Sequence, residues 1–549
     1  MTMRVPVKIG LSHQRHLPGG RRAASLLTRQ GPFAGRYPAV AAMVISALVP
    51  YLTLSAALQP LTPIIARDLH MSLQAVNLTN GLANAGYAMG TVFAVQFALR
   101  LPQRRMLLVY GVLLVVGSVL AASATASGVF IVGHVLQGLC TSLLLIAAFP
   151  PLIVGYPAAK LRWTAMVVNF CVFGAVALGP AIGGIQASAH AWRPLFWIIA
   201  GIALAALVLS VLTFQDAPPV DPRRRWDPLA LGLAATGCAA AFFGASELLT
   251  HAFLDAITFV PLIGGLALII ALLIAEYRGR CSLLNVRPLV STLPATGILV
   301  AICAAAASVS AITLSSVLLA HRYAPLHAGL LYLPEFAGAA LSAIVFGFVF
   351  RTRGLHYQVL AGMIFLSAGI VVIGRVLPPT DALALTGSGL IGLGVGSSVV
   401  PALFIAGFSL PNSNLQRVFA IIELLRAVAA FMIAPLMLHF AFTVGDSLST
   451  GTTIALWICF GISAGGALAG VCLYALGGVR PPAPSLERWF GGREPGWYSP
   501  PLLARIRRQT DAVPAVAAWG NDNANDAAAA DRLGSCFRPD RVARQTEMT

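Results

Sequence analysis

The sequence predicts an all-α membrane protein, and three observations support this. The 549 residues are 58% hydrophobic and only 10% charged, so charged side chains cannot cover a soluble core of this size. Apolar segments of about 20 residues, each long enough to cross about 30 Å of hydrocarbon, follow one another along the chain. Nothing alternates with period two, which argues against a membrane β-barrel.

Fourteen spans of this kind can be placed along the chain, and a weak internal repeat relates them. A shift of 251 residues lays the first six spans over the last six, with Arg100 on Arg351 and Gly111 on Gly362. Two six-span halves with two inserted spans suit a transporter built from repeats. The predicted spans are 38–59, 78–99, 106–125, 128–150, 163–186, 194–213, 228–249, 256–276, 293–319, 328–350, 358–377, 383–408, 417–442 and 452–477.

The N-terminal segment 1–37 carries seven Lys and Arg, no acidic residue, and no apolar stretch long enough for a signal peptide. We interpret it as a basic cytoplasmic leader; an organelle transit peptide is the alternative. With this end inside, most loop Lys and Arg fall on the cytoplasmic side, and an even number of spans places the C-terminus there too. Topology therefore explains the net charge of +17, and no nucleic-acid-binding module is visible.

The remaining segments differ in composition. Residues 214–288 form a linker with two inserted helices, between six-helix halves at 38–213 and 289–477. The tail, 478–549, begins Pro- and Gly-rich and becomes low in complexity, so we expect a cytoplasmic tail that is mostly disordered. The eight cysteines form no C-x-x-C pair and lie mainly in apolar runs, which indicates core residues and neither disulfides nor zinc ligands.

Ionisable residues within the spans are candidates for proton coupling, because a charge in the membrane costs about 2.5–3.5 kcal/mol even on lenient insertion scales. Glu335 lies inside the tenth span without a sequence-local cation. Glu423 and Arg426 share one face of the thirteenth, which fits either a structural ion pair or a coupling switch. His134, in "HVLQG", titrates near neutral pH and can carry protons; a neutral, hydrogen-bonded histidine is the alternative.

Other polar and aromatic side chains are candidates to line a cavity for an amphipathic molecule. Gln137 lies one turn after His134 and can face the same cavity. Aromatic residues more often pack or lie at the membrane interface, and this is the alternative for the rings. The cavity candidates are Tyr51, Gln59, Tyr87, Gln137, Phe170 and Phe173.

The stretch "GAVALGPAIGG", 174–184, places residues that weaken a helix late in the fifth span. Small residues let two membrane helices approach closely, and proline permits a bend. The ordered pattern resembles the antiporter motif of the fourteen-spanner drug–proton antiporter branch of the major facilitator superfamily. "AWRPLF", 191–196, and Arg426 in "ELLRAVAAF" resemble further features of that branch. The gating and packing candidates are Gly174, Gly179, Pro180, Gly183 and Gly184, and the resemblance implies a bend at Gly179 and Pro180 that seals the outer half against leak.

The chain departs from that branch between its second and third spans. The branch usually has G-x-x-x-D-R-x-G-R-R there, whereas this chain reads "QFALRLPQRR", 96–105. Arg104 and Arg105 match, and they join the gating candidates, but Arg100 stands where the acidic residue belongs. The first span also lacks the acid that many antiporters of the branch carry. The inner gate is therefore expected to be built differently or to be loose.

The resemblance implies a major-facilitator-type bundle of 14 transmembrane helices in the inner or plasma membrane. The implied function is secondary active, proton-coupled efflux of small amphipathic compounds such as drugs, by alternating access. Alternatives are an uncoupled facilitator or importer, and a transporter-like sensor or scaffold that signals through the tail. The resemblance also leaves open a periplasmic adaptor as a partner. No Walker, H-E-x-x-H or G-x-S-x-G motif is present, so we expect no enzyme, no cofactor and no metal site.

Overall fold

Fourteen helical spans dominate the computed structural model, which describes residues 31–213, 225–279, 283–284, 286–374, 380–480, 483–491 and 494–505. Each span is long and apolar enough to cross a membrane, so the prediction of an all-α, fourteen-span protein is confirmed. The uninterrupted spans are α2 (Tyr37–Asp68), α3 (Leu73–Arg100), α4 (Gln103–Ala122), α5 (Ser127–Val154), α8 (Arg193–Thr213), α9 (Pro228–Glu247), α10 (Ala256–Arg278), α11 (Thr292–Ala320), α14 (Gly354–Gly374), α15 (Asp381–Phe408), α16 (Leu415–Thr443) and α17 (Leu448–Gly477).

Two spans are interrupted within their length. The fifth consists of a short 3-10 turn η1 (Ala158–Lys160), α6 (Leu161–Asn169), a π-helical turn η2 (Phe170–Gly174) and α7 (Ala175–Ser188). The tenth consists of α12 (Pro325–Leu330) and α13 (Leu333–Val349). Short 3-10 turns also precede two other spans, η3 (Arg287–Leu289) before α11 and η4 (Asn412–Asn414) before α16.

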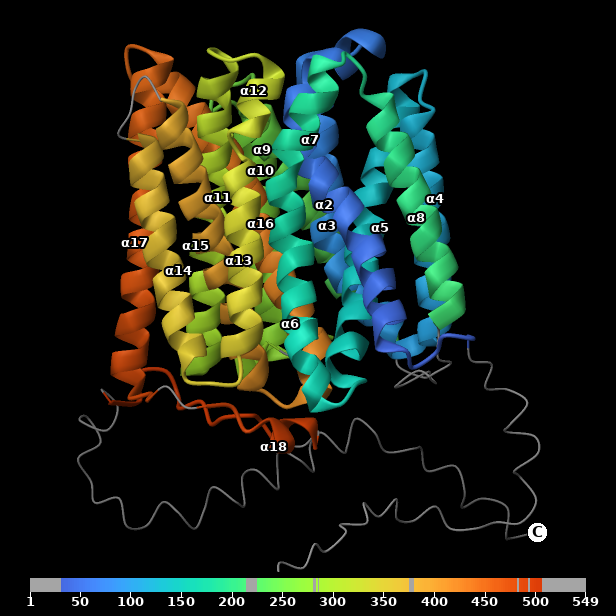
Figure 1. Ribbon diagram of the computed structural model, residues 1–549, viewed down its shortest axis with the longest axis vertical. Coiled ribbons are helices and arrows are strands. Elements are labelled where there is room, and N and C mark those ends of the chain that lie inside the picture. The colour runs from blue at the N-terminus through green and yellow to red at the C-terminus, as the bar shows by residue number, and fades with distance from the viewer. Residues whose placement is uncertain are drawn as a thin grey trace, which may run out of the picture.

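Helix packing repeats in two groups of six spans, which we name the first group (α2 to α8) and the second group (α11 to α17). In the first group, α3 and α4 both pack on α5, and α2 packs on α7 and α8. In the second group, α13 and α14 both pack on α15, and α11 packs on α16 and α17. The same relative partners thus recur, as expected when one helical unit occurs twice in a chain. Figure 1 shows the two groups side by side.

The two groups meet along two seams. On one side α3 packs against α16, and the pair α9 and α10 is attached there because α9 contacts both of these helices. On the other side α6, η2 and α7 pack against α12 and α13. A relative movement of the groups must therefore act on these seams.

The helices alternate in direction, so the bundle has two end faces. At the lower end in Figure 1, α4, η1 and α16 begin and α13 ends. We name this end the basic face, because Lys and Arg side chains lie there. The opposite end, the far face, holds the ends of α2, α7, α9 and α11. Basic side chains in the first and last turns of spans at the basic face include Arg100, Arg104, Arg105, Lys160 and Arg417.

The outside of the bundle is apolar. Large hydrophobic side chains are exposed along α4 and α8, among them Val109, Val116, Ile198 and Val208. A surface of this kind is stable in hydrocarbon and costly in water. The chain is therefore a multi-pass membrane protein.

The tail differs in part from expectation. Residues 483–491 and 494–505, which we name the strap, lie packed on the basic face and include the short helix α18 (Leu486–Phe490) (Figure 1). Within the tail 478–549, for which we expect mostly disorder, the buried indole rings of Trp489 and Trp497 anchor this portion to the bundle. Residues 506–549, and residues 1–30 of the leader, lie outside the described part of the chain.

Candidate functional site

A buried ion pair within α16 lies at the α3–α16 seam, where Tyr87 of α3 contacts it and so connects the two groups. Arg426 donates to Glu423 Oε2 from Nε at 2.9 Å and from Nη2 at 2.7 Å. Tyr87 of α3 lies 3.3 Å from both partners, donating its hydroxyl to Glu423 Oε2 and accepting from Arg426 Nη2. The spacing of three residues places both charges on one helix face, as the sequence predicts. The structure thus brings together one cavity candidate and two proton-coupling candidates.

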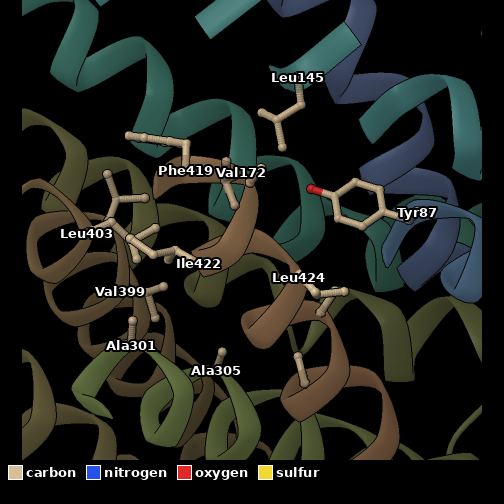
Figure 2. Close-up of a cluster of buried hydrophobic side chains, with 14 of the residues drawn as sticks. Tyr87, Leu145, Val172, Ala301, Ala305, Val399, Leu403, Phe419, Ile422 and Leu424 are labelled. Carbon is tan, nitrogen blue, oxygen red and sulfur yellow. The ribbon is translucent and has the colours of Figure 1, made fainter. Parts of the chain in front are cut away.

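Apolar side chains surround this polar group. Figure 2 shows Tyr87 extending from α3 toward side chains of α5 and α16, among them Leu145 and Leu424. Glu423 and Arg426 are only 2% and 5% exposed. Separating a buried pair leaves an uncompensated charge, which costs about 3–5 kcal/mol when one partner is removed. The ion pair is therefore a stable unit, and Tyr87 is the part that a relative movement of the groups can detach.

A second polar chain runs through the first group. Tyr51 donates to Asn84 Oδ1 at 3.2 Å, and its ring stacks on that of Tyr87 at 6.3 Å. His134 Nδ1 lies 3.1 Å from Gln137 Oε1, and Gln137 donates in turn to Ser118 at 3.0 Å. These side chains come from α2, α3, α4 and α5, which all belong to the first group. We therefore expect them to keep their contacts with one another when the first group moves.

His134 is fully buried among aromatic rings. Its ring stacks on Phe130 at 5.9 Å and lies 5.9 Å from Tyr51 and 6.2 Å from Phe196. Within the described residues, Nε2 has no hydrogen-bond partner. This is the geometry of a packed histidine, and proton handling at His134 would need water to reach that nitrogen.

Glu335 lies beside the break in the tenth span. It is in the first turn of α13, is 6% exposed, and its Oε2 has no partner in the described part of the chain. The break itself is satisfied locally, since Ser388 of α15 donates to the Leu331 carbonyl at 2.9 Å. The main chain of Glu335 lies so close to Gly392 that a Cβ there would collide with the Glu335 carbonyl. Tight backbone packing therefore places this carboxyl inside the second group.

The π-helical turn lies at the other seam. Phe173 is buried, and the Phe170 ring meets Phe336 of α13 at 5.7 Å. Just before the turn, Asn169 donates to the Gly396 carbonyl of α15 at 3.0 Å, while its Oδ1 has no partner in the described residues. π-helical turns interrupt regular helix hydrogen bonding and are frequent at functional sites. Sequence reasoning missed Asn169, although an amide inside an apolar span is a visible signal.

The glycine-rich stretch serves two contacts. Gly179 and Gly183 face α2, where an added Cβ would meet Ala56 and Ala57 respectively. Gly184 faces α12 of the second group, where an added Cβ would meet the Pro325 carbonyl. Pro180 and Gly174 lie in the same span, whose helix continues through the proline. The stretch therefore packs α7 within its own group and against the other group at once.

The remaining candidates lie at the ends of the bundle. Gln59 is exposed at the far face, where its Oε1 accepts from Ser316 of α11 at 3.0 Å. Arg104 and Arg105 lie in the first turn of α4 at the basic face, half-buried and exposed respectively. The Arg100 guanidinium lies over the Trp226 ring at 4.6 Å. In the described residues, no three His, Cys, Asp or Glu side chains gather as metal ligands do.

Two small pockets lie near the end faces of the bundle. One is at the far face, lined by residues of α11, α14 and α15 with Tyr332. The other is at the basic face, lined by Ile153, Phe419 and Trp489 with four residues of α15 and α16. Neither pocket is lined by a cavity candidate. The central side chains Tyr51, Tyr87, Gln137 and Phe173 are therefore packed in this state.

Curated proteins similar to this chain include exporters. A "Multidrug resistance protein B homolog" of Mycobacterium tuberculosis is 26% identical over 359 residues, covering 62% of this chain and 65% of that protein. The "Tetracenomycin C resistance and export protein" of Streptomyces glaucescens is 32% identical over 156 residues, covering 28% of this chain and 29% of that protein. The chain thus spans less than two thirds of the length of these relatives.

Solved structures share the fold at low identity. A POT family transporter in complex with a thioalcohol-conjugated peptide superposes with a TM-score of 0.58 at 13% identity, covering 80% of this chain and 96% of that chain. The peptide transporter POT in complex with sulfate gives 0.55 at 15% identity, covering 83% and 98%. The model of the Major Facilitator Superfamily matches residues 43–434. Because this match covers well over half of the sequence and the fold agrees with it, the chain belongs to the Major Facilitator Superfamily.

Proposed function

We propose that this protein exports small amphipathic compounds in exchange for protons, by alternating access between the basic face and the far face. Membership of the family and the relatives described as multidrug resistance and export proteins support the transporter class. The observation that carries proton coupling is Glu335, a buried carboxyl with an oxygen that lacks a partner in the described part of the chain.

Glu335 has the properties of a proton carrier. A carboxylate without a partner is destabilised by burial, whereas the same group is stable when it faces water. Each change between closed and open states therefore changes the free energy of its charged form. Proton coupling requires such a difference, because a proton that binds equally well to both states does not change the equilibrium between them.

The Tyr87–Glu423–Arg426 group has a different role in this proposal. Its charges neutralise each other at 2.7 Å, so the pair stays intact while the groups move. Tyr87 contributes its hydroxyl from the first group and contacts the pair only while the α3–α16 seam is closed. The trio therefore stabilises the closed state and exposes a charged pair to a substrate when the seam loosens.

The substrate class follows from the side chains that opening would expose. Tyr51, Tyr87 and Phe173 offer ring faces, and Gln137 and Glu335 offer polar atoms. An amphipathic compound, cationic where it meets Glu335, matches this set.

We assign the moving parts to the halves 38–213 and 289–477, with 214–288 as the inserted pair. We place the protein in the inner or plasma membrane, with the basic face on the cytoplasmic side.

The test uses the full chain in proteoliposomes with an imposed pH gradient and a cationic amphipathic dye as substrate. We expect proton flux that appears only with dye, and we expect Glu335→Gln to abolish this flux while the protein still folds. The matched control is Glu247→Gln, because Glu247 is also buried but is held by Gln74 at 2.6 Å and by His251 at 3.0 Å. Flux that survives Glu335→Gln would exclude this residue as the carrier.

An uncoupled facilitator is the second candidate, because Arg100 replaces the usual inner acid and the first span has no acid. In that case dye moves down its own concentration gradient at a rate that does not depend on the imposed pH gradient. A susceptibility panel in a host without its own pumps then identifies compounds that the chain exports.

A further inference from the structure

The strap follows α17 in the sequence and lies across the basic face. Gly478 ends α17 in the left-handed region, with φ of 68°, which glycine adopts without strain and which turns the chain sideways. The strap then folds on itself, since the Ser485 N–H donates to the Gly496 carbonyl at 2.7 Å. It is therefore a structured segment and not an extension of the last helix.

Three hydrogen bonds attach the strap to the start of α11. The N–H groups of Thr292 and Leu293 donate to the Pro500 carbonyl and to Ser499 Oγ, both at 2.9 Å. The Thr292 hydroxyl donates to the Pro501 carbonyl at 3.0 Å. The first N–H groups of a helix have no partner within the helix, so the strap serves as the cap of α11.

Trp489 anchors the middle of the strap. Its ring is 1% exposed and meets Phe408 edge to face at 5.0 Å. Its indole N–H is shared between the carbonyls of Gly407 and Leu410, at 3.3 Å and 3.0 Å. Gly496 adds an N–H bond to the Phe408 carbonyl at 2.7 Å. All of these partners belong to the second group or to the turn before α16.

The same helix also reaches the first group. α18 contacts η1, and Trp489 lines the basic-face pocket together with Ile153 of α5 and Phe419 of α16. Trp489 thus lies where the two groups meet at this face. Trp489 is hydrogen-bonded to the second group, whereas toward the first group it shares the wall of a pocket with Ile153. When the groups separate, the strap stays with the second group and breaks its contacts with the first.

We propose that the strap is a latch that holds the basic face closed, with Trp489 as its wedge between α5 and α16. Two polar contacts between the groups accompany it at this face. Gln416 donates to the Ile146 carbonyl at 3.1 Å, and Arg351 donates to the Ala158 carbonyl at 2.6 Å. No acidic side chain takes part in either. Release of Trp489 therefore favours opening toward the basic face. The inference rests on the proposed alternating access.

The first experiment measures opening directly and needs no substrate. Ile153→Cys, 2% exposed in the closed state as isoleucine, is placed in the full chain in lipid nanodiscs and treated with a membrane-impermeant maleimide. Labelling of this position is followed by peptide mass spectrometry, which separates it from the native cysteines. We expect Trp489→Ala to raise the labelling rate severalfold, because only the apolar surface that Trp489 shares with Ile153 differs between the closed and the open state.

Matched variants separate a latch from a general loss of stability. Trp457→Ala removes an indole that is 47% exposed on α17, and we expect no change in labelling. Trp489→Phe keeps a ring but loses the shared N–H bond, and we expect an intermediate rate. An unchanged rate in folded Trp489→Ala would overturn the latch.

The second experiment prevents release and does not depend on folding of a Trp489 variant. Ala159→Cys in η1 and Arg488→Cys in α18 are joined by a short bismaleimide that contains a cleavable disulfide. We expect dye transport to stop and to return after reduction; full transport while joined would overturn the proposal. If labelling responds to Trp489→Ala but no dye moves in any variant, the latch stands and the proposed transport function fails.

Discussion

At the scale of single residues, the buried polar side chains fall into two classes. Glu423, Arg426 and Tyr87 hydrogen-bond to one another, so removal of one of them leaves a buried partner group uncompensated. Glu335 and Asn169 each keep an atom without a partner among the described residues. Leaving a buried polar atom unpaired costs free energy. A functional group that must change partners during a reaction or transport cycle is one reason for a protein to keep such an atom. The second class therefore contains the better candidates for a transport cycle.

The hydroxyl of Tyr87 can be tested by Tyr87→Phe, which keeps the ring and removes both contacts with the ion pair. We expect a loss of about 1–3 kcal/mol in stability, since hydrogen bonds to charged groups are among the stronger ones. Thermal inactivation in detergent and the dye transport rate are the measurements.

Tyr110→Phe is the matched control, because the Tyr110 hydroxyl is buried without a partner in the described part of the chain. This substitution is expected to leave stability unchanged or raised. Equal losses in the two variants would show that the Tyr87 bridge contributes nothing specific.

Sequence reasoning predicts local pairs at this scale and misses distant ones. The pairing of Glu423 with Arg426 follows from a spacing of three residues on a helix. The bond from Tyr87 spans 336 positions in the sequence, so no periodicity contains it. The partner of Asn169 is a backbone carbonyl 227 positions away, which has no side-chain signature at all.

At the scale of elements, apolar length predicts the number of spans but not their ends. The first span is predicted at 38–59, whereas α2 continues to Asp68, because helical hydrogen bonding does not stop where hydrocarbon stops. The strap is missed for the opposite reason. Its Pro- and Gly-rich composition is typical of disorder, and two tryptophans buried against the bundle outweigh that composition.

The glycines of α7 give a prediction at this scale, because neighbouring positions face different helices. At Gly183 an added Cβ would lie 2.5 Å from the Ala57 carbonyl of α2, within the first group. At Gly184 it would meet Pro325 of α12, across the seam. We expect Gly183→Ala to lower stability by about 1–3 kcal/mol through overpacking. We expect Gly184→Ala to push the far face apart.

Spin labels on Ser188 and Leu326, at the ends of α7 and α12, measure that separation. The distance between the labels should lengthen in Gly184→Ala and stay unchanged in Gly183→Ala. Gly201→Ala is the control, since nothing lies within 4 Å of its added Cβ. Similar distance changes in all three variants would contradict the assignment of the two glycines to different contacts.

At the scale of the whole molecule, contacts between the two groups occur at three levels. Gln59 and Ser316 join them at the far face, Tyr87 and the ion pair join them in the middle, and Gln416 joins them to Ile146 at the basic face. The two groups are therefore in contact at both ends and in the middle in one state. Opening one face requires breaking its own contacts while the others hold, which is how a two-group bundle avoids an open channel.

We predict the orientation of the whole bundle from its charge, and two exposed positions test this prediction. Tyr498 of the strap is 77% exposed at the basic face, and Leu254 between α9 and α10 is 81% exposed at the far face. Seven spans, α10 to α17, separate them, an odd number that places them on opposite sides of a membrane. Because Lys and Arg gather at the basic face, the positive-inside rule assigns it to the cytoplasm. With an impermeant maleimide, Leu254→Cys should react in intact cells and Tyr498→Cys only after permeabilisation. The reverse pattern would invert the direction of the proposed transport, and reaction of both in intact cells would contradict the odd number of spans between them.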